Sequence, residues 1–384
     1  VPAAVLPAIG THVDLPVIVP LNEIATDPDG DAVVFRIVGA ENATASFTPD
    51  GTGLRIRPDA GHAGTARLRV VADDGFAASP EIVLDVAISD APLVSIDLVM
   101  REYRVDLPGQ AAPFVVIGQF ADKADVILPL DYVTVTSLDP ETASVSGQGV
   151  LTTSGPGDTA IIARRGALAA GTGVIVGDPE DPAGLMSLLF GIDAFPDTVT
   201  ILAAGGSRQI VTNVGGDPDL RVPGDDADIA YVVGDEGVVR VTAGGLIEAV
   251  GVGETSITVI YRGAEETIRV RVDNPVEGNA ADLGTAGGAI RTPDGAVLAI
   301  GGGQLAGDAT VTFRTMGEAE LPLDVPPDFD FVAGAQWDVA GAEITGPVQL
   351  ALPTVGIAPG TEVYFFVEMD HSDGTDGAYG RMWT

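Results

Sequence analysis

The chain has 384 residues, a length that predicts three or four domains. It carries 55 acidic side chains against 19 basic ones, and its formal net charge of -36 excludes nucleic acid and anionic membrane surfaces as favourable partners. It has no cysteine, which excludes disulfide bonds, thiolate zinc sites and a cysteine nucleophile. No run is long and apolar enough to predict insertion in a membrane.

The strong acidity itself has three interpretations, which the sequence leaves open. Negative charge keeps a protein soluble and resists self-association. Carboxylates are also the ligands that divalent cations such as calcium prefer. A third possibility is life in high salt, where screening removes the repulsion between like charges.

Most patterned segments alternate apolar and polar residues with a period of two. Residues 66–70, 81–86 and 267–272 show the pattern clearly. Such alternation gives a strand one buried and one exposed face, as a β-sandwich requires. Fifty glycines and 27 prolines supply frequent turns, and helical periodicity is almost absent. We therefore predict an all-β chain of immunoglobulin-like sandwich modules.

Three polar, proline-containing breaks follow finished strands, at residues 89–92, 177–182 and 273–275. Short links with proline restrict the angle between neighbouring modules. The sequence thus predicts four modules arranged as an extended rod. Their predicted bounds are 1–91, 92–179, 180–274 and 275–384.

The first module contains Asp27, Asp29 and Asp31 in an Asp-Pro-Asp-Gly-Asp run, and Asp73 and Asp74 before a glycine. These segments resemble cadherin-like and bacterial Ig-like repeats. The resemblance implies that the two loops meet at one end of the sandwich. Converging carboxylates repel unless a cation lies between them, so we expect calcium here. The alternative is that each aspartate belongs to an ordinary solvated turn.

A segment of the second module recurs in the third without a gap. Val145 matches Val241, Gly149 matches Gly245 and Ile161 matches Ile257. Both copies resemble the bacterial Ig-like group 2 (BIG2) domain, with strand residues followed by a glycine turn and a Gly-x-Gly-x-Thr stretch. The resemblance implies a large bacterial or archaeal surface or secreted protein, of which this chain is a fragment. The family offers no catalytic residues to transfer.

The last module contains residues 287–300, 310–313 and 347–353, which loosely resemble a ZU5-type β-domain. The resemblance leaves open whether the domain is complete at its C-terminus. Near its end, Asp370, Asp373 and Asp376 lie in a glycine-broken stretch. They form a second candidate cation site, with a polar loop as the alternative.

The sequence offers little for catalysis. Its three histidines, His12, His62 and His371, lie in different segments, and it has neither a Gly-x-Ser-x-Gly nor a His-Glu-x-x-His motif. Among 55 acidic residues some pair will always suit a glycosidase mechanism, so that hypothesis has no discriminating power. We expect a protein that is not an enzyme.

The prediction is therefore an extracellular or cell-surface structural and adhesive protein. Its expected partners are other protein modules, copies of itself, or a host or cell-surface receptor or glycan. One alternative is a self-assembling subunit of a surface layer, sheath or filament. Another is an accessory carbohydrate-binding region of a secreted enzyme, suggested by aromatic residues of the last module such as Trp337, Tyr364 and Trp383.

Overall fold

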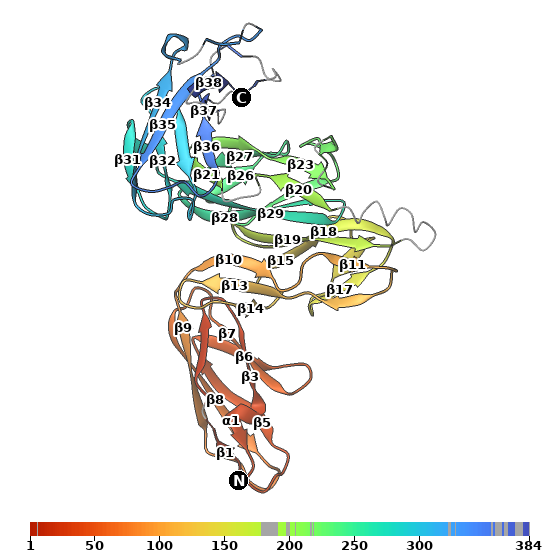
Figure 1. Cartoon of the computed structure of the whole chain (residues 1–384). Coiled ribbons are helices and arrows are strands. Elements are labelled where there is room, and N and C mark those ends of the chain that lie inside the picture. The colour runs from red at the N-terminus through yellow and green to blue at the C-terminus, as the bar shows by residue number, and fades with distance from the viewer. Residues whose placement is uncertain are drawn as a thin grey trace. The chain divides into compact units, whose positions relative to one another are not determined.

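The computed structural model is built almost entirely of β-strands (Figure 1). It describes residues 1–354 except 6, 178–190, 197–199, 204, 216, 218, 322, 323 and 327, and then residues 356, 357, 363, 364, 368–372 and 379–383. Within these residues the helices are α1 (Leu21–Ile24) and η1 (Glu318–Glu320). No described helix has the length and apolar character needed to cross a lipid bilayer.

Two compact units divide the described chain. The first contains residues 1–191 together with the short segments 228–235 and 260–265. The second contains residues 192–227, 236–259 and 266–384. We call segments 228–235 and 260–265, which belong to the first unit, the docked segments.

The first sandwich packs a four-stranded sheet, in the order β2-β9-β8-β5, on a three-stranded sheet, β3-β7-β6. Ile82, Leu84 and Val86 are buried between the sheets, whereas Val83 and Asp85 face solvent, which confirms the predicted alternation. Its strands are β1 (Ala3–Ala4), β2 (Ile9–His12), β3 (Val17–Pro20), β4 (Ala25–Thr26), β5 (Val34–Glu41), β6 (Ala43–Phe47), β7 (Gly53–Pro58), β8 (Gly64–Asp73) and β9 (Ile82–Ser89).

The second sandwich contains three sheets, ordered β11-β19-β18-β15, β10-β13-β14 and β12-β17-β16. Phe114, Leu151 and Ile161 lie in its core, and the buried Tyr103 hydroxyl donates to the Pro113 carbonyl at 2.8 Å. Its strands are β10 (Leu93–Leu98), β11 (Tyr103–Val105), β12 (Ala111–Pro113), β13 (Val116–Phe120), β14 (Val126–Leu128), β15 (Thr134–Ser137), β16 (Ala143–Val145), β17 (Val150–Thr153), β18 (Gly157–Arg165) and β19 (Leu168–Val176).

The third sandwich repeats this plan, with sheets β21-β29-β28-β25, β20-β23-β24 and β22-β27-β26. The recurring sequence segments therefore have matching strands, although the BIG2 resemblance stays a prediction. Ile268, Val270 and Val272 are buried at alternate positions, as predicted. The strands are β20 (Ile192–Phe195), β21 (Thr200–Ala203), β22 (Ser207–Gln209), β23 (Val211–Val214), β24 (Arg221–Val222), β25 (Ile229–Val233), β26 (Val239–Val241), β27 (Leu246–Ala249), β28 (Gly253–Tyr261) and β29 (Ala264–Asp273).

The fourth sandwich has sheets β30-β32-β33-β36 and β31-β34-β35 around Ile290, Leu298 and Phe313, and β37 pairs with β38. The all-β prediction is confirmed. The module bounds, the rod and the ZU5 resemblance stay predictions. The strands are β30 (Val276–Glu277), β31 (Ala280–Leu283), β32 (Gly288–Arg291), β33 (Val297–Ile300), β34 (Ala309–Met316), β35 (Gly334–Ala340), β36 (Val348–Ala351), β37 (Glu368–Ser372) and β38 (Tyr379–Trp383).

Candidate functional site

The first acidic loop of the candidate calcium site follows β4. The Asp27 Oδ1 atom accepts the backbone N–H groups of Asp29 at 2.8 Å and Asp31 at 3.4 Å. This pattern is a turn that the aspartate stabilises with its own side chain. Asp29 and Asp31 themselves are exposed to solvent. One side of the Asp27 carboxylate is therefore committed to the turn.

The second acidic loop follows β8. Asp74 Oδ1 accepts the N–H groups of Ala77 at 2.7 Å and Phe76 at 2.8 Å, and these bonds lower the pKa of Asp74 to about 2. Asp73 is exposed, and its Oδ1 accepts the N–H of Gly75 at 2.8 Å. Asp74 thus stays ionised throughout the pH range of ordinary environments.

The remaining oxygens of Asp27 and Asp74 face a common position. The backbone nitrogen of Val1 lies 3.4 Å from Asp27 Oδ2 and 3.2 Å from Asp74 Oδ2. The two carboxylate side chains are only 1% and 4% exposed, and Asp27 Oδ2 accepts no hydrogen bond from the residues that the structure describes. Two buried oxygens that share one nitrogen form a position that favours positive charge.

The structure thus brings together two of the five residues predicted for this site. Within the described part of the chain, no group of three or more His, Asp or Glu side chains is arranged to hold a metal ion. Asp373 and Asp376 of the second candidate site lie outside the described residues, and Asp370 is described only as backbone of β37. Calcium at either place stays a prediction.

A contact between the first and second sandwiches, which the sequence analysis missed, involves a buried histidine. The His12 ring stacks on Phe120, with centroids 3.7 Å apart, and its Nε2 lies 2.8 Å from Asp122 Oδ1. The Ser89 hydroxyl donates to the other Asp122 oxygen at 2.5 Å. Leu15, only 3% exposed, packs in the core of the second sandwich. We call this contact the first joint.

Arginines reinforce the first joint. Arg55 and Arg57, neighbours on one face of β7, both donate to Asp131 of the second sandwich. In the opposite direction, Arg165 lies 3.8 Å from Asp14 and stacks over the Tyr132 ring at 4.1 Å. Arginine suits such places because its planar group binds carboxylates and ring faces together.

The docked segments pack on β18 and β19 in a second apolar contact. Val232 and Ile260 of the docked segments are each 2% exposed and cluster with Ala160 and Ala169 of the two strands. Backbones approach very closely here. A Cβ atom on Gly173 would lie 1.9 Å from the Gly263 carbonyl oxygen. Glycine at this position therefore allows the contact to form.

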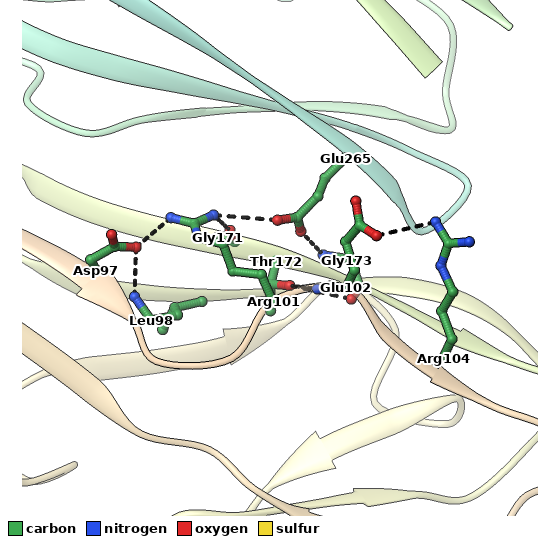
Figure 2. A network of polar contacts seen from close by, with 9 residues as sticks. All are labelled: Asp97, Leu98, Arg101, Glu102, Arg104, Gly171, Thr172, Gly173 and Glu265. Atoms are coloured by element: carbon green, nitrogen blue, oxygen red, sulfur yellow. Dashed lines mark hydrogen bonds and ion pairs between the residues drawn. The ribbon is translucent and has the colours of Figure 1, made fainter. Parts of the chain in front are cut away.

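A polar network crosses the same contact (Figure 2). The Glu265 side chain, only 5% exposed, accepts the Gly173 N–H at 2.7 Å and lies 3.4 Å from Arg101. Arg101 also donates to the Gly171 carbonyl at 2.8 Å and to Asp97 at 2.5 Å. The network thus ties the docked segments to both β19 and the loop after β10. No local sequence pattern signals it, because Arg101 and Glu265 are 164 residues apart.

A shallow cavity of about 320 Å³ lies in the second unit, lined by Asp294, Glu320 and Phe331 among others. Tyr364 is 56% exposed and meets Phe329 edge-on at 5.4 Å, and Trp337 is 40% exposed. The side chain of Trp383 is not described. These features leave the carbohydrate-binding alternative a prediction.

Comparison with known families finds a similarity in the first part of the chain. Residues 2–87 match the family model of the bacterial Ig domain. This agrees with the expected bacterial Ig-like module at the N-terminus. No curated protein matches the chain.

Solved structures that resemble the chain do so loosely. An endo-fucoidan hydrolase of glycoside hydrolase family 107 is 12% identical over 72% of this chain, with a TM-score of 0.22. Domains 1–6 of surface layer protein SbsC are 16% identical over 92% of this chain, with a TM-score of 0.21. The human desmocollin-1 ectodomain is 11% identical over 94%, with a TM-score of 0.19 and 80% of that chain covered. This chain spans 44% of the hydrolase and 53% of the surface layer protein.

Proposed function

We propose that the chain is a non-enzymatic part of an extracellular bacterial or archaeal surface protein, in which closely joined sandwiches position binding surfaces and bear tension. The bacterial Ig match at residues 2–87 supports the class of protein. The observation that carries the proposal is the first joint, where Leu15 of one sandwich is buried in the core of the next. A side chain shared in this way opposes free rotation between neighbours.

The strand pairing also suits tension. In the first three sandwiches an early strand pairs in parallel with the last strand: β2 with β9, β11 with β19 and β21 with β29. A force that pulls the two ends of such a sandwich apart loads the hydrogen bonds of the pair together, in shear. Antiparallel strands pulled from one end would instead open one bond at a time. The pairing therefore favours resistance to force over easy unzipping.

The absence of catalysis belongs to the same proposal. His12, which has a close carboxylate partner, is 4% exposed and stacked on Phe120. A buried ring engaged in this way cannot reach a substrate as a general base. His62 lies on the exposed side of a turn, with a Thr65 carbonyl at 3.4 Å as its contact.

Single-molecule force spectroscopy tests the mechanical role. Val105→Pro removes a backbone N–H from β11 within its parallel pair with β19. The control Val105→Ala also loses the valine side chain but keeps the N–H. We expect the proline variant to lower the force of one unfolding event well below that of the alanine variant. Equal forces in the two variants would contradict the proposed shear geometry. Light scattering of the same chain separates a monomeric spacer from a self-assembling subunit.

The proposal includes a calcium ion bound near Asp27 and Asp74, because both carboxylates are buried and no described residue donates a hydrogen bond to Asp27 Oδ2. A cation that binds only the folded state raises the melting temperature of the first sandwich. We expect calcium to raise it in the parent chain and in an Asp31→Asn control, but not in Asp27→Asn. The same melting curve in calcium and in chelator for the parent chain would remove calcium from the proposal.

A further inference from the structure

The rim of the docked-segment contact holds several acidic groups. Asp158 lies on β18 and is partly buried. The charges of Asp228 and Arg262 act on it from the docked segments, and the charge of Asp139 acts on it from the loop after β15. Its partner position on the neighbouring β19 is the apolar Ile175. The groups near Asp158 are thus two carboxylates and one guanidinium.

Arg262 is already engaged by one of these carboxylates. Its Nε donates to Asp228 Oδ2 at 3.1 Å, and this bond raises the pKa of Arg262. Asp139 accepts the Thr142 hydroxyl at 2.8 Å and the Glu141 N–H at 3.0 Å, which lowers its pKa and keeps it ionised. Among the described residues, Asp158 therefore forms no ion pair of its own. Burial, and then the charge of Asp228, raise the pKa of Asp158.

We propose that the contact between the docked segments and β18–β19 is a pH-sensitive joint, which protonation of Asp158 tightens and ionisation of Asp158 loosens. Asp158 lies on β18 two residues before Ala160 of the apolar contact, and the charges of Asp228 and Arg262 act on it from the docked segments. When the segments separate, Asp158 regains water and loses the Asp228 charge. Each protonation state of Asp158 thus favours one position of the segments.

The direction in which pH changes docking follows from linkage between proton binding and docking. An acid whose pKa is higher in the docked state binds its proton more tightly there, so acidification favours docking. The stabilisation is complete below the ordinary aspartate pKa of about 3.9 and is lost as pH rises through the raised value. Each unit of difference between the docked and undocked pKa changes the docking equilibrium by about tenfold.

The small size of the contact makes it sensitive to one charge. Its apolar centre consists of four buried residues, Ala160, Ala169, Val232 and Ile260, two of which are alanines. The alanines bury little apolar area, so the apolar stabilisation of the contact comes mainly from Val232 and Ile260. A single ionised carboxylate at the rim can therefore shift the equilibrium measurably.

Because the native chain lacks cysteine, one introduced thiol reports on opening of the joint. Ala169 is 2% exposed beneath the docked segments, so a thiol in Ala169→Cys reacts with maleimide when they lift away. The rate is divided by that of Ala87→Cys, an exposed position, which cancels the pH dependence of the thiol itself. Hydrogen exchange of residues 260–265, in a chain without introduced cysteine, gives a second measure of the same opening.

We expect the normalised rate to rise several-fold between pH 4 and pH 7 in the parent background. Asp158→Asn should keep it low and nearly independent of pH, whereas Asp338→Asn, an exposed control in the second unit, should follow the parent. Arg262→Ala removes the shared cation and should raise the rate at neutral pH. The proposal is overturned if Asp158→Asn keeps the parental pH dependence or opens more readily than the parent at pH 7.

Discussion

Replacing Gly173 by alanine tests the close approach on which the docked segments depend. The new Cβ would lie 1.9 Å from the Gly263 carbonyl oxygen, whereas real contacts of this kind are essentially never below 3.0 Å. The obstacle is backbone, so it cannot move aside as the end of a flexible side chain does. The docked segment must retreat by at least about 1 Å to admit a methyl group.

That retreat has a second cost. The Gly173 N–H donates to the buried Glu265 carboxylate at 2.7 Å, and a shift of about 1 Å stretches this bond beyond hydrogen-bonding distance. Overpacking costs about 1–3 kcal/mol and a lost bond to a charged group about 1.5–3 kcal/mol. We therefore expect docking to weaken by about 3 kcal/mol or more, which is more than a hundredfold in the opening equilibrium.

Hydrogen exchange of residues 260–265 measures this loss directly, because it reports local opening without unfolding of the sandwiches. Gly147→Ala is the matched control, since its Cβ would meet nothing within 4 Å. Gly171→Ala should be intermediate, because its Cβ would meet the Val232 side chain at 2.7 Å and not backbone. If Gly173→Ala exchanged as slowly as Gly147→Ala, the reasoning from close approach would be wrong.

Three further substitutions test the remaining contacts. Leu15→Ala should destabilise the first joint by about 2–5 kcal/mol because it leaves a cavity in the core of the second sandwich. Leu138→Ala should change the stability little because Leu138 is 58% exposed. The rate of protease cleavage near residues 89–92 measures the difference. Glu265→Gln should keep the Gly173 hydrogen bond and lose the attraction to Arg101, and Glu265→Ala should lose both. The Gly173 amide should therefore exchange fastest in Glu265→Ala, more slowly in Glu265→Gln and most slowly in the parent chain. The Thr48 and Thr52 hydroxyls lower the pKa of Asp50 to about 2, so its contribution is present above the ordinary aspartate pKa and is lost as pH falls through about 2. Asp50→Asn should accordingly flatten the pH dependence of unfolding by urea between about pH 4 and 2, and an unchanged curve would exclude this contribution.

Strand identity could be predicted because it depends on local patterns. Arg67 and Arg69 face outward on β8 while Leu68 and Val70 are buried, as their alternation predicts. The same reasoning located the two acidic loops, since each is an aspartate-rich turn next to a strand. It could not tell which oxygens would converge, because Asp29, Asp31 and Asp73 lie in the same turns as Asp27 and Asp74 yet face solvent.

The joints could not be predicted, for a physical reason. His12 and Asp122 are 110 residues apart and Arg101 and Glu265 are 164 apart, so neither pair produces a period, a motif or a composition shift. Gly173 likewise lies within an apolar strand segment that also contains Ala170 and Gly171, where small residues have many explanations. Only the packing of distant segments shows which glycine has no room for a side chain.

The placement of arginine explains how so acidic a chain can form tight contacts. With 55 acidic and 19 basic side chains, most surfaces repel one another, and repulsion is strongest where water is excluded. Arg55, Arg57 and Arg165 all lie at the first joint, and Arg101 and Arg262 lie at the docked segments. All but Arg262 bind a carboxylate across the contact, whereas Arg262 binds Asp228 between the two docked segments. Positive charge is thus placed where negative segments meet. Asp158 has no such ion-pair partner in the part of the chain that the structure describes, and for this reason we expect pH to act at the docked segments.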